Sequence, residues 1–229
     1  MERYAGIPKF KIAAGPDLAM EKFRQVINGG KVSPEEVNKW LDENGIILKD
    51  FIGEGNNGKV FLVDSDKYGN DIAMKVTWQR EEMNSIKAIN KWQQGADLKH
   101  LPEILWIGKF PKEWHEGQVP GVYLRPHYKE IPFLSDEDAD RLFLEILLEV
   151  PAVVWPRDLH GSDNVAKDDR TGELVYYDPW LTSGDAGHAM RRILDLLGEM
   201  AKHPGPDRAY GHTTEEIKAL IEKIKHGGG

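Results

Sequence analysis

The chain has 229 residues, of which 40% are hydrophobic and 30% charged, and its formal net charge is -8. Proteins that bind duplex DNA usually carry an excess of positive charge, so nucleic acid is not an expected partner. The sequence has no cysteine, which excludes disulfides, zinc–thiolate sites and a cysteine nucleophile. No apolar run approaches the ~18 residues of a membrane span, and the first residues do not resemble a signal peptide. We therefore expect a soluble, cytoplasmic protein with no membrane partner.

Two amphipathic helices are predicted within the first 45 residues. The apolar residues of the first helix fall roughly on one face, and they are Leu18, Phe23, Val26 and Ile27. Gly29 and Gly30 end this helix. The second helix opens with Ser33 as N-cap and Glu36 three residues later, which is a capping box. It carries an apolar stripe of its own, made of Val37, Trp40 and Leu41.

From residue 46 the pattern changes from helical to strand-like. Short runs rich in β-branched and aromatic residues predict strands at residues 46–52, 59–64, 71–78, 103–108 and 121–126. A helix is predicted between the third and fourth of these strands, at residues 79–94. The second half is mainly helical, with Ser135 as the N-cap of one helix and further helices at residues 190–200 and 214–225. Strands followed by helices are typical of an α+β protein.

A glycine-rich segment lies between the first two predicted strands, and it reads Gly53-Glu54-Gly55-Asn56-Asn57-Gly58-Lys59-Val60. Glycines let the main chain turn tightly and approach phosphate oxygens with no Cβ in the way. An ordinary hairpin could have the same composition. A dinucleotide-binding turn would be followed by a helix, whereas residues 60–63 predict a strand. The pattern therefore favours a lid over the phosphates of ATP.

Lys75 stands in an apolar stretch at the end of the third predicted strand. Such a lysine usually extends its ammonium group to solvent, but beside a phosphate cradle the ammonium can reach the phosphates. The lysine needs a carboxylate partner, and Glu82 is the candidate because it lies on the apolar face of the next helix, whereas Glu81 does not. Alternatively, both glutamates simply favour a helix N-terminus.

Together, the glycine-rich segment, the strand with Ala73 and Lys75, and the helix with Glu82 resemble the small lobe of the protein-kinase-like superfamily. The resemblance implies that residues 53–58, Val60 and Ala73 enclose the nucleotide. It also implies that Lys75, held by Glu82, contacts the phosphates. The adenine is expected beside the strand that leaves the small lobe, near Tyr123, Leu124 and Arg125.

The resemblance continues in the second half, where residues 153–165 are similar to the kinase catalytic loop. It implies that Asp158 accepts or orients the proton of the attacking hydroxyl and that Asn164 binds Mg²⁺. A short strand at residues 174–177 then ends in Asp178, where the family places its principal Mg²⁺ ligand. Asp and Asn are also common turn residues, but all of these elements in the family's order predict a kinase-like fold.

Several residues depart from the family's pattern. The spacing from Asp158 to Asn164 is one residue longer than usual, so either the loop bulges or Asp163 is itself the metal ligand. Pro156 replaces the usual histidine, and Asp178-Pro179-Trp180 replaces Asp-Phe-Gly. These features resemble aminoglycoside phosphotransferases, lipopolysaccharide kinases and compact bacteriophage kinases more than eukaryotic protein kinases.

We therefore expect a two-lobed α+β, protein-kinase-like fold, with a helical N-terminal extension (residues 1–45), a β-rich N-lobe (46–126) and a reduced helical C-lobe (127–229). ATP and Mg²⁺ would lie between the lobes. The γ-phosphate would pass to a hydroxyl, with Ser/Thr of a protein as the expected acceptor and a small molecule such as an aminoglycoside or sugar as the alternative. A third possibility is a nucleotide-binding pseudokinase, which the altered loop spacing favours and the retained lysine and aspartates oppose.

Overall fold

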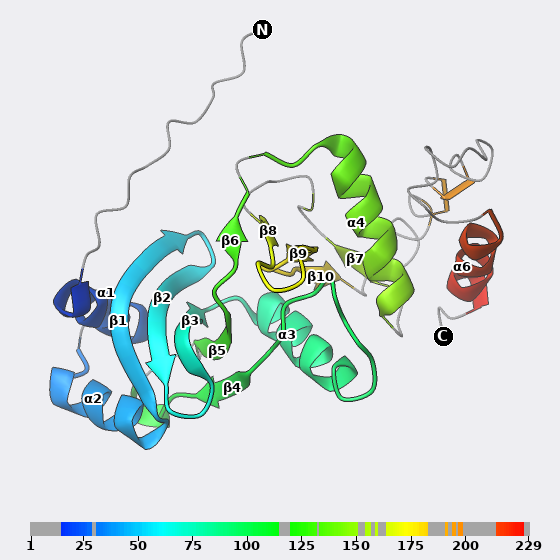
Figure 1. Cartoon of the computed structure of the whole chain (residues 1–229). Helices are drawn as coiled ribbons and strands as arrows, with labels where there is room; N and C mark the ends of the chain where they lie inside the picture. Colours follow the sequence, from blue (N-terminus) through cyan, green and yellow to red (C-terminus); the bar gives the residue numbers. More distant parts are fainter. Residues whose placement is uncertain are drawn as a thin grey trace, which may run out of the picture. The chain divides into compact units, whose positions relative to one another are not determined.

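A computed structural model of the chain describes residues 15–28, 31–114, 120–131, 133–150, 154–156, 159, 164–182, 191, 194–195, 197–198 and 214–226 (Figure 1). The protein is mixed α+β and divides into two compact units. The first unit holds the described residues of 1–79 and 105–127, and the second those of 80–104 and 128–229. The predicted boundaries of an extension and two lobes stay a prediction.

The helices and strands follow one another in this order: α1 (Gly15–Asn28), α2 (Pro34–Glu43), β1 (Ile46–Gly55), β2 (Gly58–Ser65), β3 (Gly69–Thr77), α3 (Arg80–Trp92), β4 (Trp106–Lys109), the 3-10 helix η1 (Lys112–Trp114), β5 (Gly121–Pro126), β6 (Lys129–Glu130), α4 (Asp136–Glu149), β7 (Trp155–Pro156), β8 (Val165–Lys167), β9 (Leu174–Tyr176), β10 (Leu181–Thr182) and α6 (Thr214–His226). The elements predicted up to residue 150 are present, with ends that differ by a few residues, and the last predicted helix is α6. The helix predicted at residues 190–200 lies mostly outside the described residues.

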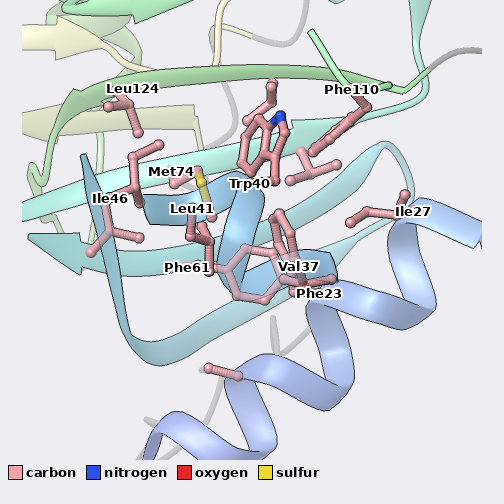
Figure 2. Close-up of a cluster of buried hydrophobic side chains, with 14 of the residues drawn as sticks. Phe23, Ile27, Val37, Trp40, Leu41, Ile46, Phe61, Met74, Phe110 and Leu124 are labelled. Atoms are coloured by element: carbon pink, nitrogen blue, oxygen red, sulfur yellow. The ribbon is translucent and has the colours of Figure 1, made fainter. Parts of the chain in front are cut away.

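The first unit is built on a five-stranded antiparallel sheet in the order β1-β2-β3-β5-β4. Helices α1 and α2 precede the sheet, and their apolar stripes form one core with it (Figure 2). In α1 the fully buried residues recur at the helical period, as Ala19, Phe23 and Ile27. The predicted capping box of α2 is confirmed, because Ser33 Oγ accepts from Glu36 N at 3.2 Å and Glu36 Oε2 accepts from Ser33 N at 3.0 Å.

Aromatic side chains join the two helices to the sheet. The Phe23 ring of α1 meets Phe61 of β2 edge-on, with ring centroids 5.4 Å apart. The ring centroids of Trp40 in α2 and Phe110 lie 4.8 Å apart. The indole N–H of Trp40 donates to the carbonyl of Lys109 at 3.3 Å. The two helices of the predicted N-terminal extension therefore share a hydrophobic core with the strands.

The second unit contains α3, α4, α6 and two small sheets, one in the order β6-β8-β9 and one made of β10 and β7. Ser135 caps α4 as predicted, because its Oγ accepts from Asp138 N at 3.0 Å. The buried side of α4 carries Leu142, Phe143, Ile146 and Leu147. In the part of the chain that the structure describes, no helix has the length and apolarity required to cross a membrane.

His100 ties α4 to β9 within the second unit. Its Nδ1 lies 2.6 Å from Glu149 Oε1, and its main-chain N–H donates to Glu149 Oε2 at 3.1 Å. Its carbonyl accepts from Tyr176 N at 3.0 Å. Burial lowers the pKa of the imidazole, but the hydrogen bond and the charge of Glu149 outweigh burial and hold the pKa above its ordinary value. These contacts fix the strand that immediately precedes Tyr177 and Asp178.

Candidate functional site

The register of the five-stranded sheet places most of the predicted nucleotide-binding side chains on one face. Val60 of β2 pairs with Lys75 of β3, and Lys75 pairs with Tyr123 of β5. Two residues away on the same strands, Ala73 pairs with Arg125. Directly paired residues share a face of a sheet, as do residues two apart on a strand. The sequence thus brings residues from three strands together on the face that carries Lys75.

The other face of the same strands belongs to the hydrophobic core. Phe61 pairs with Met74, and Met74 pairs with Leu124. All three are buried in the apolar cluster with α1 and α2 (Figure 2). The side chain of Leu124 lies on this face, away from Lys75, and the predicted contact of residues 123–125 with the nucleotide stays a prediction.

The glycine-rich segment forms the hairpin between β1 and β2, with Asn56 and Asn57 as its two turn residues. Gly55 pairs with Gly58 across the hairpin, and the register shifts between Phe51 and Gly53. Such an irregularity bends a strand and increases its twist. The prediction that a strand, and not a helix, follows the glycines is confirmed.

Two of the glycines differ in what surrounds them. A Cβ on Gly58 would lie 2.2 Å from the carbonyl oxygen of Val76 and 3.0 Å from Thr77 Cα, both main-chain atoms. Gly58 is therefore required by its packing on β3. A Cβ on Gly55 would meet nothing within 4 Å. The space beside Gly55 is thus free of the described chain, and this glycine is not explained by packing.

Thr77 anchors the tip of the hairpin, a role that the sequence analysis missed. Its Oγ1 donates to the carbonyl of Asn57 at 2.7 Å, and Trp78 N donates to the same carbonyl at 3.3 Å. Thr77 is fully buried at the end of β3. A buried threonine two residues after a candidate lysine was a weak signal, because β-branched residues are common in any strand.

Glu54, on the hairpin, is held by two lysines. It forms an ion pair with Lys59 across the hairpin, and its Oε2 lies 3.8 Å from Lys22 Nζ of α1. The hydrogen bond from Lys59 and then its charge lower the pKa of Glu54 below the ordinary value. Both lysine ammonium groups also lie within 6.0 Å of the centre of the Phe51 ring. Helix α1 therefore contacts the glycine-rich hairpin directly.

Lys75 and Glu82 are buried charged residues, one in each unit. Lys75 is 4% exposed in β3, and Glu82 is 2% exposed in α3. Glu82 lies on the buried face of α3 with Ile86, as its helical position predicts, whereas Glu81 is exposed. Burying a charge is costly, and such residues are typical of ion-pair networks and functional sites. Pairing of Lys75 with Glu82 stays a prediction.

Two of the predicted metal ligands lie at one end of the β8–β9 hairpin in the second unit. Val165 of β8 pairs with Tyr176 of β9, and the carbonyl of Asn164 accepts from Tyr177 N at 3.0 Å. Asn164 therefore immediately precedes β8 at the end of the hairpin where Asp178 follows β9, and both residues are partly buried. Carboxylate and amide oxygens are ligands that Mg²⁺ accepts. The donor set thus fits the predicted cation.

The remaining predicted residues of this unit, Asp158 and Asp163, lie outside the described residues. Among the residues that the structure does describe, no group of three or more His, Cys, Asp or Glu side chains is arranged to hold a metal ion. A metal site at the end of the β8–β9 hairpin would therefore depend on the amide of Asn164 in addition to carboxylates.

Comparison with known proteins does not assign roles to these residues. No protein-family model and no curated protein matches the sequence. The structure aligns with the crystal structure of a double mutant of the PknI kinase domain from Mycobacterium tuberculosis, with a TM-score of 0.46 and 10% sequence identity, over 81% of this chain and 96% of that chain. Because these values are low, we base the functional proposal on the residues of this chain.

Proposed function

We propose that this protein is an ATP- and Mg²⁺-dependent phosphotransferase of the kinase-like type. The observation that carries the proposal is the row of Val60, Lys75 and Tyr123 on one face of the sheet, next to a glycine-rich hairpin. A buried lysine is rare in a sheet. Here it pairs directly with the strand of the hairpin, and Gly55 in that hairpin has open space beside it.

The first unit would bind the nucleotide. Main-chain N–H groups of the hairpin suit phosphate oxygens, and the ammonium group of Lys75 adds a positive charge to the same face. An adenine ring requires apolar surface, which the partly exposed Val60 would offer on this face, whereas Ala73 and Tyr123 are fully buried there. Gly58 and Thr77 hold the hairpin against β3, which would lower the entropic cost of ordering the cradle on binding.

The second unit would supply the catalytic groups. Asn164 and Asp178 are the residues that would hold Mg²⁺, which when bound neutralises charge on the phosphates. Asp158 would accept the proton of the acceptor hydroxyl as its oxygen bonds to the γ-phosphorus and the bond from that phosphorus to the β–γ bridging oxygen breaks, releasing ADP. Glu82 would hold Lys75 in place.

The acceptor we propose is a Ser/Thr hydroxyl of a protein. A small-molecule hydroxyl is the alternative within the same chemistry. A pseudokinase that binds nucleotide without transferring phosphate differs from both, because it would bind Mg-ATP and release no ADP.

Mg-ATP should raise the melting temperature of the protein. A ligand that binds only the folded state stabilises it by about 2.7 kcal/mol at 100 times its Kd. For a chain of this length that corresponds to roughly 5–11 °C. Differential scanning fluorimetry with and without Mg-ATP measures the shift.

Three variants make this measurement specific. Lys75→Met should abolish most of the shift, and Gly55→Ala should reduce it without lowering the melting temperature of the free protein, because its Cβ meets nothing within 4 Å. Lys49→Met is the matched control, since Lys49 is a partly exposed lysine of β1 that pairs with Asp64 and Asp71. A shift of zero in the wild type, or an equal shift in Lys75→Met and Lys49→Met, would contradict nucleotide binding at this face.

Replacing Asn164 should raise the Mg²⁺ requirement more than replacing Asp163. The amide of Asn164 lies next to the end of β8 with Asp178 nearby in the hairpin, and the family's ligand at this point is an amide. We expect Asn164→Ala to need roughly 10-fold more Mg²⁺ for half-maximal activity, which is the usual effect of removing a group that supports a metal site. Asp163→Ala should need about the same Mg²⁺ concentration as the wild type. A Mg²⁺ titration of turnover decides this. The opposite pattern would assign the ligand to Asp163.

A further inference from the structure

A serine that no part of the proposed chemistry uses links two segments of the second unit. Ser85 lies in α3, one turn after Glu82, and is 2% exposed. Its Oγ accepts from the N–H of Leu181 at 2.9 Å. Two carbonyl oxygens lie within reach of its single proton, that of Glu81 at 3.0 Å and that of Leu181 at 3.3 Å. Both main-chain groups of Leu181 therefore face one buried hydroxyl.

Leu181 belongs to the segment that starts at Asp178. The N–H of Trp180, between them, donates to the hydroxyl of Tyr176 at 3.0 Å. Leu181 itself begins β10 and pairs with Pro156 of β7. Strand β7 ends two residues before Asp158. Two hydrogen bonds thus fix the course of the chain from Asp178 to β10. One joins Trp180 to Tyr176, and the other joins Leu181 to Ser85.

We propose that Ser85 is a positioning residue for phosphoryl transfer. Its hydrogen bond links the helix that carries Glu82 to the segment that carries Asp178, so the position of the segment depends on that of the helix. The inference rests on the proposed function, but the hydrogen bond that carries it can be tested by itself in the free protein. A buried N–H that loses its acceptor is not satisfied by water, so the segment must move to find another. Small displacements of a metal ligand or a reacting group lower the rate strongly.

The test compares Ser85→Ala with Ser85→Thr, which keeps the hydroxyl, and with Ser65→Ala. Ser65 is a suitable control because it is also a buried serine, 5% exposed, and its Oγ accepts only a long bond of 3.4 Å from Lys67 N among the bonds described for it. The first readout is hydrogen exchange of the Leu181 amide in the free protein, measured by NMR. The second is the Mg²⁺ concentration for half-maximal turnover at saturating ATP.

We expect Ser85→Ala to speed exchange at Leu181 and to raise the Mg²⁺ requirement roughly 10-fold, with little change in the KM for ATP. Ser85→Thr should restore both, and Ser65→Ala should change neither. If Ser85→Ala proves too unstable to purify, Ser85→Cys, a weaker hydrogen-bonding group of similar size, should show the same two changes to a smaller extent.

Faster exchange at Leu181 with a wild-type Mg²⁺ requirement would overturn the inference, because the hydrogen bond would then serve the fold alone. An unchanged exchange rate would overturn it as well. Wild-type protein that binds no Mg-ATP would instead refute the proposed function, and the positioning role would fall with it. Active wild type together with fully active Ser85→Ala refutes the positioning role only.

Discussion

Trp40→Ala should lower the free energy of unfolding by about 3–5 kcal/mol, the usual effect of removing a large buried aromatic side chain. Trp40 is 5% exposed and its ring centre lies 4.8 Å from that of Phe110 and 6.0 Å from that of Phe23. The variant also removes the donor to the Lys109 carbonyl. Urea unfolding followed by circular dichroism, or the melting temperature, measures the loss.

Trp78→Ala is the matched control, because Trp78 lies in the same unit and its side chain is 36% exposed. We expect this control to cost about 1 kcal/mol or less, as substitutions of partly exposed residues usually do. Equal effects of the two substitutions would contradict a common core of α2 and the sheet. Helices α1 and α2 belong to the core of the first unit, and the large expected effect of Trp40→Ala follows from that packing.

The second large effect concerns the two aspartates of the proposed chemistry. Asp158→Asn should lower turnover by roughly 10²-fold or more while ATP affinity stays nearly unchanged, because the proposed role of the carboxylate is to accept the proton of the acceptor hydroxyl. Asp178→Asn should lower turnover and also weaken Mg²⁺-dependent ATP binding, because its carboxylate is a proposed metal ligand. Steady-state kinetics and calorimetric titration of ATP with and without Mg²⁺ separate the two.

Asp169→Asn serves as the control for both variants. Asp169 is an exposed residue of the turn between β8 and β9, at the opposite end of the hairpin from Asp178. The Asp169→Asn variant should have the same turnover and ATP binding as the wild type. Full activity of purified Asp158→Asn would show that another group receives the proton. Unchanged Mg²⁺-dependent binding in Asp178→Asn would remove this residue from the metal site.

Much of the first unit could be predicted because its signals are local. Short runs rich in β-branched and aromatic residues predicted β2 and β3, and the capping box predicted the start of α2. The apolar stripes of α1 and α2 showed that each helix buries one face. They could not show that Phe23 meets Phe61, since an apolar stripe does not specify its partner. The sequence therefore supported only a helical N-terminal extension, without naming the residues on which the two helices pack.

The candidate site was predicted less completely, for reasons of geometry. Consecutive residues of a strand point to opposite faces, so Leu124 cannot share a face with Tyr123 and Arg125. The sequence placed the adenine near these three residues without assigning a face to each, and their contact with the nucleotide stays a prediction. The role of Gly58 depends on the approach of β3, which is distant in sequence. The contact of Ser85 with Leu181 spans 96 positions and leaves no local pattern.

The most direct test is to follow the label of [γ-³²P]ATP incubated with purified protein and Mg²⁺. The acceptors are a protein lysate and, separately, a panel of sugars and aminoglycosides. We predict labelled product in one of these mixtures, its loss when EDTA removes Mg²⁺, and a reduction of roughly 10²-fold or more with Asp158→Asn. Labelled protein would support the Ser/Thr acceptor and labelled sugar or aminoglycoside the alternative. Mg-ATP binding with no transfer to any acceptor and no release of ADP would contradict the proposed enzyme and leave a nucleotide-binding module.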